Sequence, residues 1–174
     1  MTDLLIRALP SCEIAAHIPE LNEVLIDCVA GGASVSFMHP LSVEKAAGFW
    51  QDVARSVEKR ERILLIAQDL HQQIIGTVQL ILDQPENQPH RADVAKLLVH
   101  SRARRFGVAR RLMQQLEFSA RAAGRHVLVL DTATGSHAEM LYQNLGWLRV
   151  GELPEYALMP DGAFCSTTFY YKHL

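Results

Sequence analysis

Cysteine is scarce in this chain of 174 residues, which contains only Cys12, Cys28 and Cys165. The three are widely separated, form no C-x-x-C pair and have no spacing typical of metal ligands. An odd number also leaves no complete disulfide framework. We therefore expect reduced cysteines in a cytoplasmic protein that has no metal centre.

Long hydrophobic runs are missing as well. No apolar stretch approaches the roughly 20 residues that a membrane-spanning helix needs. The first residues lack the basic segment and apolar core of a secretory signal. These absences argue against a membrane partner and agree with a cytoplasmic location.

The chain also lacks a strong charge bias, since its formal net charge is −2 and charged residues make up 21%. Five arginines nevertheless gather between positions 102 and 111. Apart from Phe106, no aromatic residue is interleaved with them, so we expect no nucleic-acid partner. With 49% hydrophobic residues, the composition predicts one soluble domain over residues 1–174.

The most informative stretch runs from Asp93 to Gly124. Residues 93–99 form a short apolar run typical of a strand, and an arginine-rich loop follows at 102–109. Apolar residues then recur every four positions, at Val108, Leu112, Leu116 and Ala120. This spacing predicts an amphipathic helix that ends near Gly124.

The start of this helix has the chemistry of an anion site. The first turn of a helix presents free backbone N–H groups and the positive end of the helix dipole. Gly107 allows a ligand to approach the main chain closely, and the arginines add positive charge. The pattern is neither a P-loop nor the dinucleotide motif, so it indicates a diphosphate of another kind. The alternative is a solvated basic loop that caps an ordinary helix.

Alternating patterns predict the remaining elements. We expect a helix after Ser11 that starts near Ile18, because Pro19 suits a first turn, and a second helix capped by Ser42. Strands are expected at 4–8, 63–67, 74–82, 126–131, 147–153 and 166–172, a helix at 136–145 and a loop at 154–163. This order predicts an α/β domain of the α+β type, with a mixed, mostly antiparallel sheet of about seven strands flanked by about four helices.

Two motifs resemble the GNAT superfamily of N-acetyltransferases. Arg104-Arg-Phe-Gly-Val-Ala109 is similar to its loop Gln/Arg-x-x-Gly-x-Gly/Ala, which holds the pyrophosphate of acetyl-coenzyme A. The stretch from Ala138 to Trp147 resembles the closing helix Ala-x-x-x-Tyr-x-x-x-Gly-Phe/Trp. One position departs from the pattern, because Arg105 stands where many members have glycine.

A narrower resemblance covers loops as well as core strands. Blocks at 31–38, 91–99, 130–132, 149–154 and 160–162 are similar to the tabtoxin-resistance acetyltransferase group. This resemblance implies transfer of acetyl from acetyl-coenzyme A to an amine. In the tabtoxin-resistance enzyme after which the group is named, the acceptor is a β-lactam phytotoxin.

The superfamily resemblance also implies the residues that hold the coenzyme. A backbone N–H near Leu98 or Val99 would bind the acetyl carbonyl, and Tyr142 would lie near the sulfur. The implied coenzyme-binding residues are Leu98, Val99, Arg104, Arg105, Phe106, Gly107, Val108, Ala109, Ser136 and Tyr142.

Acetyl transfer to an amine needs a base for the amine and an acid for the leaving thiolate. The resemblance points to Asp93 and Asp131 as candidate bases on neighbouring parallel strands, and the sequence does not decide between them. A normal aspartate pKa near 3.9 suits ammonium binding and proton relay through water. Tyr142 is the candidate acid. The alternatives are aspartates that cap strand ends and a core tyrosine.

Ser34, Phe37 and Met38 are expected on the acceptor side, with Tyr156 and Asp161 at the same mouth. We expect a small-molecule amine as acceptor. The alternatives are a protein N-terminus, lysine or polyamine, or a coenzyme-binding sensor without turnover. Members of the superfamily are often dimers, and the sequence leaves the oligomeric state open.

Overall fold

The computed structural model describes residues 4–174. Its elements follow one another as β1 (Leu5–Ala8), α1 (Ser11–Ala30), α2 (Val43–Glu58), β2 (Arg62–Gln68), β3 (Ile74–Ile81), β4 (Arg91–Val99), the 3-10 turn η1 (Ser101–Ala103), α3 (Val108–Ala122), β5 (Val127–Ala133), α4 (His137–Asn144), β6 (Leu148–Leu158) and β7 (Phe164–His173).

One seven-stranded sheet organises the chain, in the order β1-β2-β3-β4-β5-β7-β6. Every neighbouring pair is antiparallel except β4 and β5, which run parallel. The predicted fold class, a single mixed and mostly antiparallel α/β domain with four helices, is therefore confirmed.

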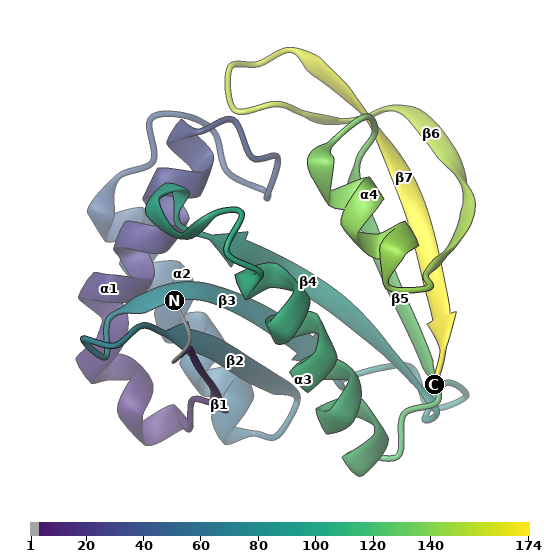
Figure 1. Cartoon of the computed structure of the whole chain (residues 1–174), viewed down its shortest axis with the longest axis horizontal. Coiled ribbons are helices and arrows are strands. Elements are labelled where there is room, and N and C mark those ends of the chain that lie inside the picture. Colours follow the sequence, from purple (N-terminus) through teal and green to yellow (C-terminus); the bar gives the residue numbers. More distant parts are fainter. Residues whose placement is uncertain (1–3) are drawn as a thin grey trace.

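Helices cover both faces of the sheet (Figure 1). On one face α3 packs its apolar stripe, which includes Leu112 and Leu116, against buried residues of β2 to β5. On the other face α1 and α2 enclose a second cluster around Trp50 and Leu64. These two apolar layers fix the sheet between the helices and so fix the ends of β4 and β5.

The helix α1 corrects one prediction, because it begins at Ser11 and not near Ile18, and it contains Pro19 in its interior. A proline inside a helix removes a hydrogen bond and costs about 3 kcal/mol. Pro19 and Ala15, whose carbonyl loses the bond, are both exposed, so water can satisfy that carbonyl. Burial of Ile14 on the same face as Leu21 keeps the first turns helical.

The strand β6 corrects a second prediction, because residues 154–158 continue the strand where a loop was expected. Pro154 can occupy a strand here since β6 is an edge strand and has no partner on its outer side. A bulge between Leu153 and Ala157 absorbs the irregularity, and Glu155 has a φ of 51°.

Candidate functional site

The sheet opens between its two parallel strands. β4 and β5 pair only where residues 91–93 lie beside residues 127–129. Beyond this point both strands continue, β4 to Val99 and β5 to Ala133, and no ladder joins them. Figure 1 shows β4 running toward α1 while β5 runs under α4. The structure thus confirms the predicted parallel neighbours and leaves an opening between their ends.

A bulge in β4 starts this divergence. The register against β3 shifts between Thr77 and Gln79, and Lys96 on β4 has a φ of 54°. The Thr77 hydroxyl donates to the Lys96 carbonyl at 3.1 Å, which holds the bulge in place. Bulges bend and twist a strand, so this one turns the end of β4 away from β5.

The backbone of Val99 faces the opening. The His100 N–H donates to the Ile75 carbonyl at 2.9 Å, toward β3. Successive residues of a strand point their N–H groups to opposite sides, so the Val99 N–H points to the unpaired edge. Of the two predicted N–H donors, the geometry favours that of Val99, because Leu98 pairs with Thr77 of β3.

The predicted diphosphate loop lies at the end of β4 and leads into α3. Arg105 has a φ of 67° and Gly107 a φ of 78°, so two residues of the loop are left-handed. Arginine therefore occupies the position where many relatives carry glycine without changing the turn that glycine favours. Gly107 is the N-cap of α3, and no side chain caps it.

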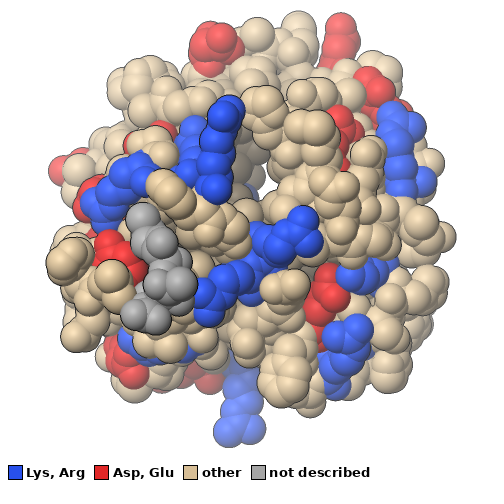
Figure 2. All heavy atoms as spheres, in the orientation of Figure 1, with Lys and Arg blue, Asp and Glu red and all other residues tan. Residues whose placement is uncertain are grey.

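Backbone donors gather along this loop. Within residues 4–174, no hydrogen-bond acceptor is found for the N–H groups of residues 105–110. They surround the positive end of the α3 dipole, the arrangement that binds phosphate oxygens elsewhere. In Figure 2, Lys and Arg side chains gather around a hollow near the centre of the face where α3 begins. The loop therefore fits the diphosphate of a coenzyme.

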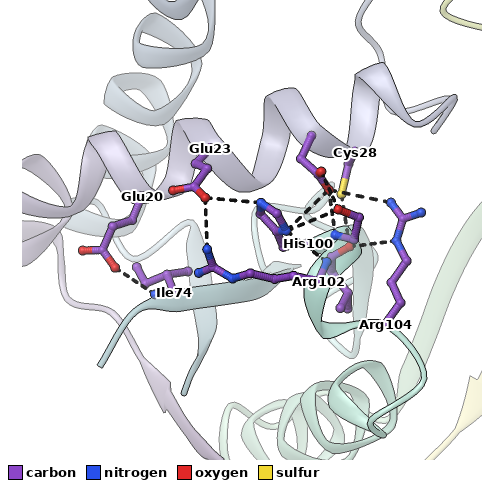
Figure 3. Close-up of polar contacts among 10 residues, drawn as sticks. Glu20, Glu23, Cys28, Ile74, His100, Arg102 and Arg104 are labelled. Atoms are coloured by element: carbon purple, nitrogen blue, oxygen red, sulfur yellow. Dashed lines mark hydrogen bonds and ion pairs between the residues drawn. The ribbon is translucent and has the colours of Figure 1, made fainter. Parts of the chain in front are cut away.

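A polar network fastens the segment before this loop to α1 (Figure 3). Asp27 accepts hydrogen bonds from the Ser101 N–H and hydroxyl, both at 2.7 Å. Burial raises the pKa of Asp27, but these bonds and the charges of His100 and Arg104 outweigh it and leave the pKa below its ordinary value. Glu23 pairs with Arg102 at 3.2 Å and with His100 at 3.3 Å.

Arg104, predicted to bind coenzyme, belongs to this network. Its Nε donates to the Val99 carbonyl at 3.2 Å, and its guanidinium lies 3.9 Å from Asp27. The Cys28 thiol also donates to the Val99 carbonyl, at 3.5 Å, and burial raises its pKa. Arg104 and Cys28 thus orient the Val99 peptide that borders the opening.

The two candidate carboxylates have different surroundings. Asp93 is paired with Arg91 and accepts a hydrogen bond from Gln84 at 3.1 Å. Asp131 forms no ion pair within 4 Å among the described residues. Burial raises the pKa of Asp131, the charge of Lys96 partly offsets this, and the charge of Asp93 adds to it. Asp131 is therefore the carboxylate that is free to exchange a proton.

Tyr142 lies in α4, on the same face of the sheet as α3 and opposite to the face of Asp131. Its ring packs 5.9 Å from the rings of Trp147 and Tyr170, measured between centroids, and the residue is buried. Burial and the negative charge of Asp131 raise its pKa, so the phenol stays protonated at neutral pH. Within residues 4–174, no hydrogen bond involves its hydroxyl. The phenol can therefore donate to a ligand.

Ser136 is the N-cap residue of α4, and its hydroxyl lies 3.3 Å from that of Thr132. Its predicted contact with the coenzyme stays a prediction. In the loop before α2, the Ser34 hydroxyl donates to the Leu158 carbonyl at 3.1 Å, while Met38 is exposed. Phe37 packs edge to face against Phe49 at 5.3 Å, so its ring lies against α2.

Sequence reasoning missed two residues at the opening, Lys96 and Ser36. The Lys96 ammonium donates to the Ser36 hydroxyl at 3.1 Å, across 60 positions of the chain. Burial lowers the pKa of Lys96, although the charge of Asp131 opposes this. The only sequence signal was a lysine inside an otherwise apolar strand.

Two further observations concern the described residues alone. None of their helices is both long and apolar enough to cross a bilayer. No group of three or more His, Cys, Asp or Glu side chains among them is arranged to hold a metal ion.

Comparison with known proteins supports the superfamily. The model of the acetyltransferase (GNAT) family matches residues 28–147. An uncharacterized N-acetyltransferase of Azospirillum brasilense is 31% identical over 133 residues, which cover 75% of this chain and 76% of the relative.

Solved structures agree with the fold. The ribosomal-protein-alanine N-acetyltransferase of Brucella melitensis superposes with a TM-score of 0.81 at 23% identity, covering 98% of this chain and 99% of the other. A putative acetyltransferase of Salmonella typhimurium, solved with its cofactor acetyl-CoA, superposes with a TM-score of 0.79 at 17% identity. The match covers 99% of this chain and 95% of the other. The narrower resemblance to the tabtoxin-resistance group stays a prediction. With its family model, its relative and its fold in agreement, the chain belongs to the GNAT family of acetyltransferases.

Proposed function

We propose that the protein transfers acetyl from acetyl-coenzyme A directly to the amine of a small molecule. The observation that carries this proposal is the opening between β4 and β5. Free backbone donors line one side of it, Tyr142 lies on one face of the sheet and Asp131 faces the other. A thioester that passes through the opening meets an acid on one face and a base on the other.

The loop would hold the coenzyme by its diphosphate. The free N–H groups of residues 105–110 supply donors, and the α3 dipole favours negative charge. The linker of the coenzyme would then run along the unpaired edge of β4. This direction brings its thioester to the Val99 N–H.

The chemical step needs no covalent enzyme intermediate. The Val99 N–H polarises the acetyl carbonyl, a contact of the kind worth about 2.7–4 kcal/mol. The amine nitrogen bonds to the carbonyl carbon and the carbon–sulfur bond breaks. The proton that the amine loses goes to Asp131 through water, and the Tyr142 hydroxyl protonates the leaving thiolate and takes a proton back from water before the next turnover.

Asp131 suits the role of base better than Asp93. The carboxylate of Asp93 is occupied by Arg91 and Gln84, whereas Asp131 has no such partner. A raised pKa also makes Asp131 a stronger base than an ordinary aspartate. Asp93 would then hold negative charge near the ammonium and keep the proton affinity of Asp131 high.

Two hydrogen-bonded loops beside the opening support a small acceptor. The loop before α2 is bonded to the loop between β6 and β7, because Ser34 donates to Leu158 and the His39 N–H donates to the Pro160 carbonyl at 3.0 Å. The two loops lie together above the opening in Figure 1. An amino-acid-like or β-lactam toxin fits this proposal, and a protein N-terminus, lysine or polyamine is the alternative.

The test is thiol release after the protein is mixed with acetyl-coenzyme A and a panel of small amines. We expect release with at least one small amine, and calorimetry should show coenzyme binding in its absence. Coenzyme binding without release across the panel would favour the sensor alternative. Acetylated peptides in a treated lysate, without small-molecule turnover, would favour a protein acceptor.

A further inference from the structure

Lys96 places an ammonium at the acceptor side of the opening without a carboxylate in contact. Its Nζ donates to the Ser36 hydroxyl at 3.1 Å, and no acidic oxygen of the described residues lies within 4 Å of it. Burial disfavours this charge, as its lowered pKa shows. A half-buried cation without a carboxylate in contact carries a desolvation cost, so the position is suited to an anion from a ligand.

Backbone strain marks the same two residues. Lys96 has a φ of 54° and Ser36 a φ of 75°, and neither is a glycine. Left-handed backbone is unfavourable at such residues, and it is found often at ligand sites. The bulge in β4 and the turn in the loop before α2 therefore bring the side chains of Lys96 and Ser36 into contact.

The charges around Lys96 indicate which anion fits. Asp131 on β5 interacts with Lys96 by its charge but forms no ion pair with it, and Arg62 on β2 adds further positive charge. A cation and an anion held apart at one opening can bind a zwitterion, because each charge of the ligand then lies beside the opposite charge of the protein. The ammonium of such a ligand would face Asp131, and its anionic group would face Lys96.

We propose that Lys96, together with the Ser36 hydroxyl, binds the carboxylate of the acceptor and so selects amino acids over simple amines. This inference rests on the proposed function, since Asp131 must receive the amine of the same molecule. It assigns Lys96 a role in specificity and leaves the transfer step to Asp131 and Tyr142.

The experiment measures thiol release with each of the common L-amino acids and with its carboxamide, which keeps the amine and lacks the negative charge. The variants are Lys96→Met, which keeps the length of the side chain, and Lys96→Arg, which keeps the charge. Thermal melting and the affinity for coenzyme A serve as folding controls, because the coenzyme loop lies outside this contact.

We expect the free acid of the best acceptor to exceed its carboxamide at least tenfold in kcat/KM. Lys96→Met should raise KM for the acid about 10- to 100-fold, leave kcat within about threefold and leave the carboxamide unchanged, while Lys96→Arg restores part of the loss. Equal use of acid and carboxamide overturns the proposal, and so does an equal loss for both in Lys96→Met. Absence of turnover with every acceptor, while acetyl-coenzyme A binds, overturns the proposed function and the anchor together.

Discussion

The two sides of the opening are built in different ways. On the β4 side, Asp27 and Glu23 of α1 bind Ser101 and Arg102, in the segment before the coenzyme loop. Figure 3 shows Glu23 beside Arg102. On the β5 side, Tyr142 of α4 packs against the rings of Trp147 and Tyr170, and the Tyr170 hydroxyl also donates to Glu139 of α4 at 3.0 Å.

The difference matches what each side must do. Polar bonds are directional, so the β4 side orients backbone groups such as the Val99 carbonyl. Aromatic packing excludes water, so the β5 side keeps the phenol of Tyr142 neutral. One side is specialised for geometry and the other for protonation state. Four substitutions test this comparison.

Tyr142→Phe removes only the hydroxyl on the β5 side. We expect kcat to fall about 10²- to 10⁴-fold, the range typical of a lost general acid. Stability should hardly change, because no described residue bonds to that hydroxyl. Thiol release and thermal melting measure the two effects. A kcat within threefold of the parent would remove Tyr142 from the mechanism.

Gly107→Val acts on the β4 side, at the start of α3. A β-branched residue is strained at a φ of 78°, so the loop must change shape and its donors move. Proline is a poorer choice, because its φ near −65° would disturb the helix start as well. We expect the affinity for coenzyme A to fall about 10- to 100-fold by calorimetry, as for the loss of one hydrogen bond to a charged group.

Gly107→Asn is the matched control, since asparagine tolerates left-handed backbone better than other residues. It should retain most of the affinity. An affinity for Gly107→Val equal to that of the parent would separate the loop from coenzyme binding.

Asp27→Ala breaks the polar network of the β4 side. Ser101 loses two hydrogen bonds to a charged acceptor, so we expect a loss of about 1–3 kcal/mol in unfolding free energy. Because the pKa of Asp27 is lowered in the folded state, its contribution is present at neutral pH and disappears as the pH falls through that pKa. Denaturation at pH 7 and at acid pH measures both. Asp52→Ala, which removes an exposed pair with Arg55, should cost less than about 1 kcal/mol.

Asp131→Asn should have opposite effects on stability and activity. The pKa of Asp131 is raised in the folded state, so the fold is most stable below the ordinary aspartate pKa, where the group is protonated, and it loses stability as the pH rises through the raised value. The unfolding free energy of the variant should therefore be slightly higher than that of the parent at pH 7. The gain should be less than about 1 kcal/mol, because the residue is exposed, and it should vanish in acid.

The same variant should lose the rise of kcat/KM with pH that a carboxylate base produces. Lys96, Asp93 and Tyr142 carry the charges and protons that surround this group, and none of them changes in the variant. A parent profile without a limb in the acid range would point to another base.

Sequence reasoning reached the elements that depend on local patterns. The α3 stripe and the Ser42 cap follow from spacing and from residue type, and the structure bears out both of them. The Ser42 hydroxyl, for example, accepts from the Lys45 N–H at 3.2 Å. Such features involve residues within one turn of each other, where local preferences decide.

Features that depend on tertiary contact were missed. Pro19 looked like a helix start, and only the burial of Ile14 shows that the helix extends before it. The contact between Lys96 and Ser36 needs a bulge in one strand and a left-handed turn in a distant loop. Nothing local to either residue predicts the other, so the proposed acceptor site became visible only in three dimensions.

The sheet order also dictates when the site can form during folding. β5 pairs with β4 over residues 127–129 alone, but with β7 over its whole length, from 127 to 133. The segment that carries Asp131 is therefore stabilised mainly by residues 167–173, which lie more than thirty positions later. Since β7 is the last strand to be synthesised, the catalytic half of the sheet can be completed only after the coenzyme half has been made. A nascent chain would form its coenzyme loop before the segment that carries Asp131 is held in place.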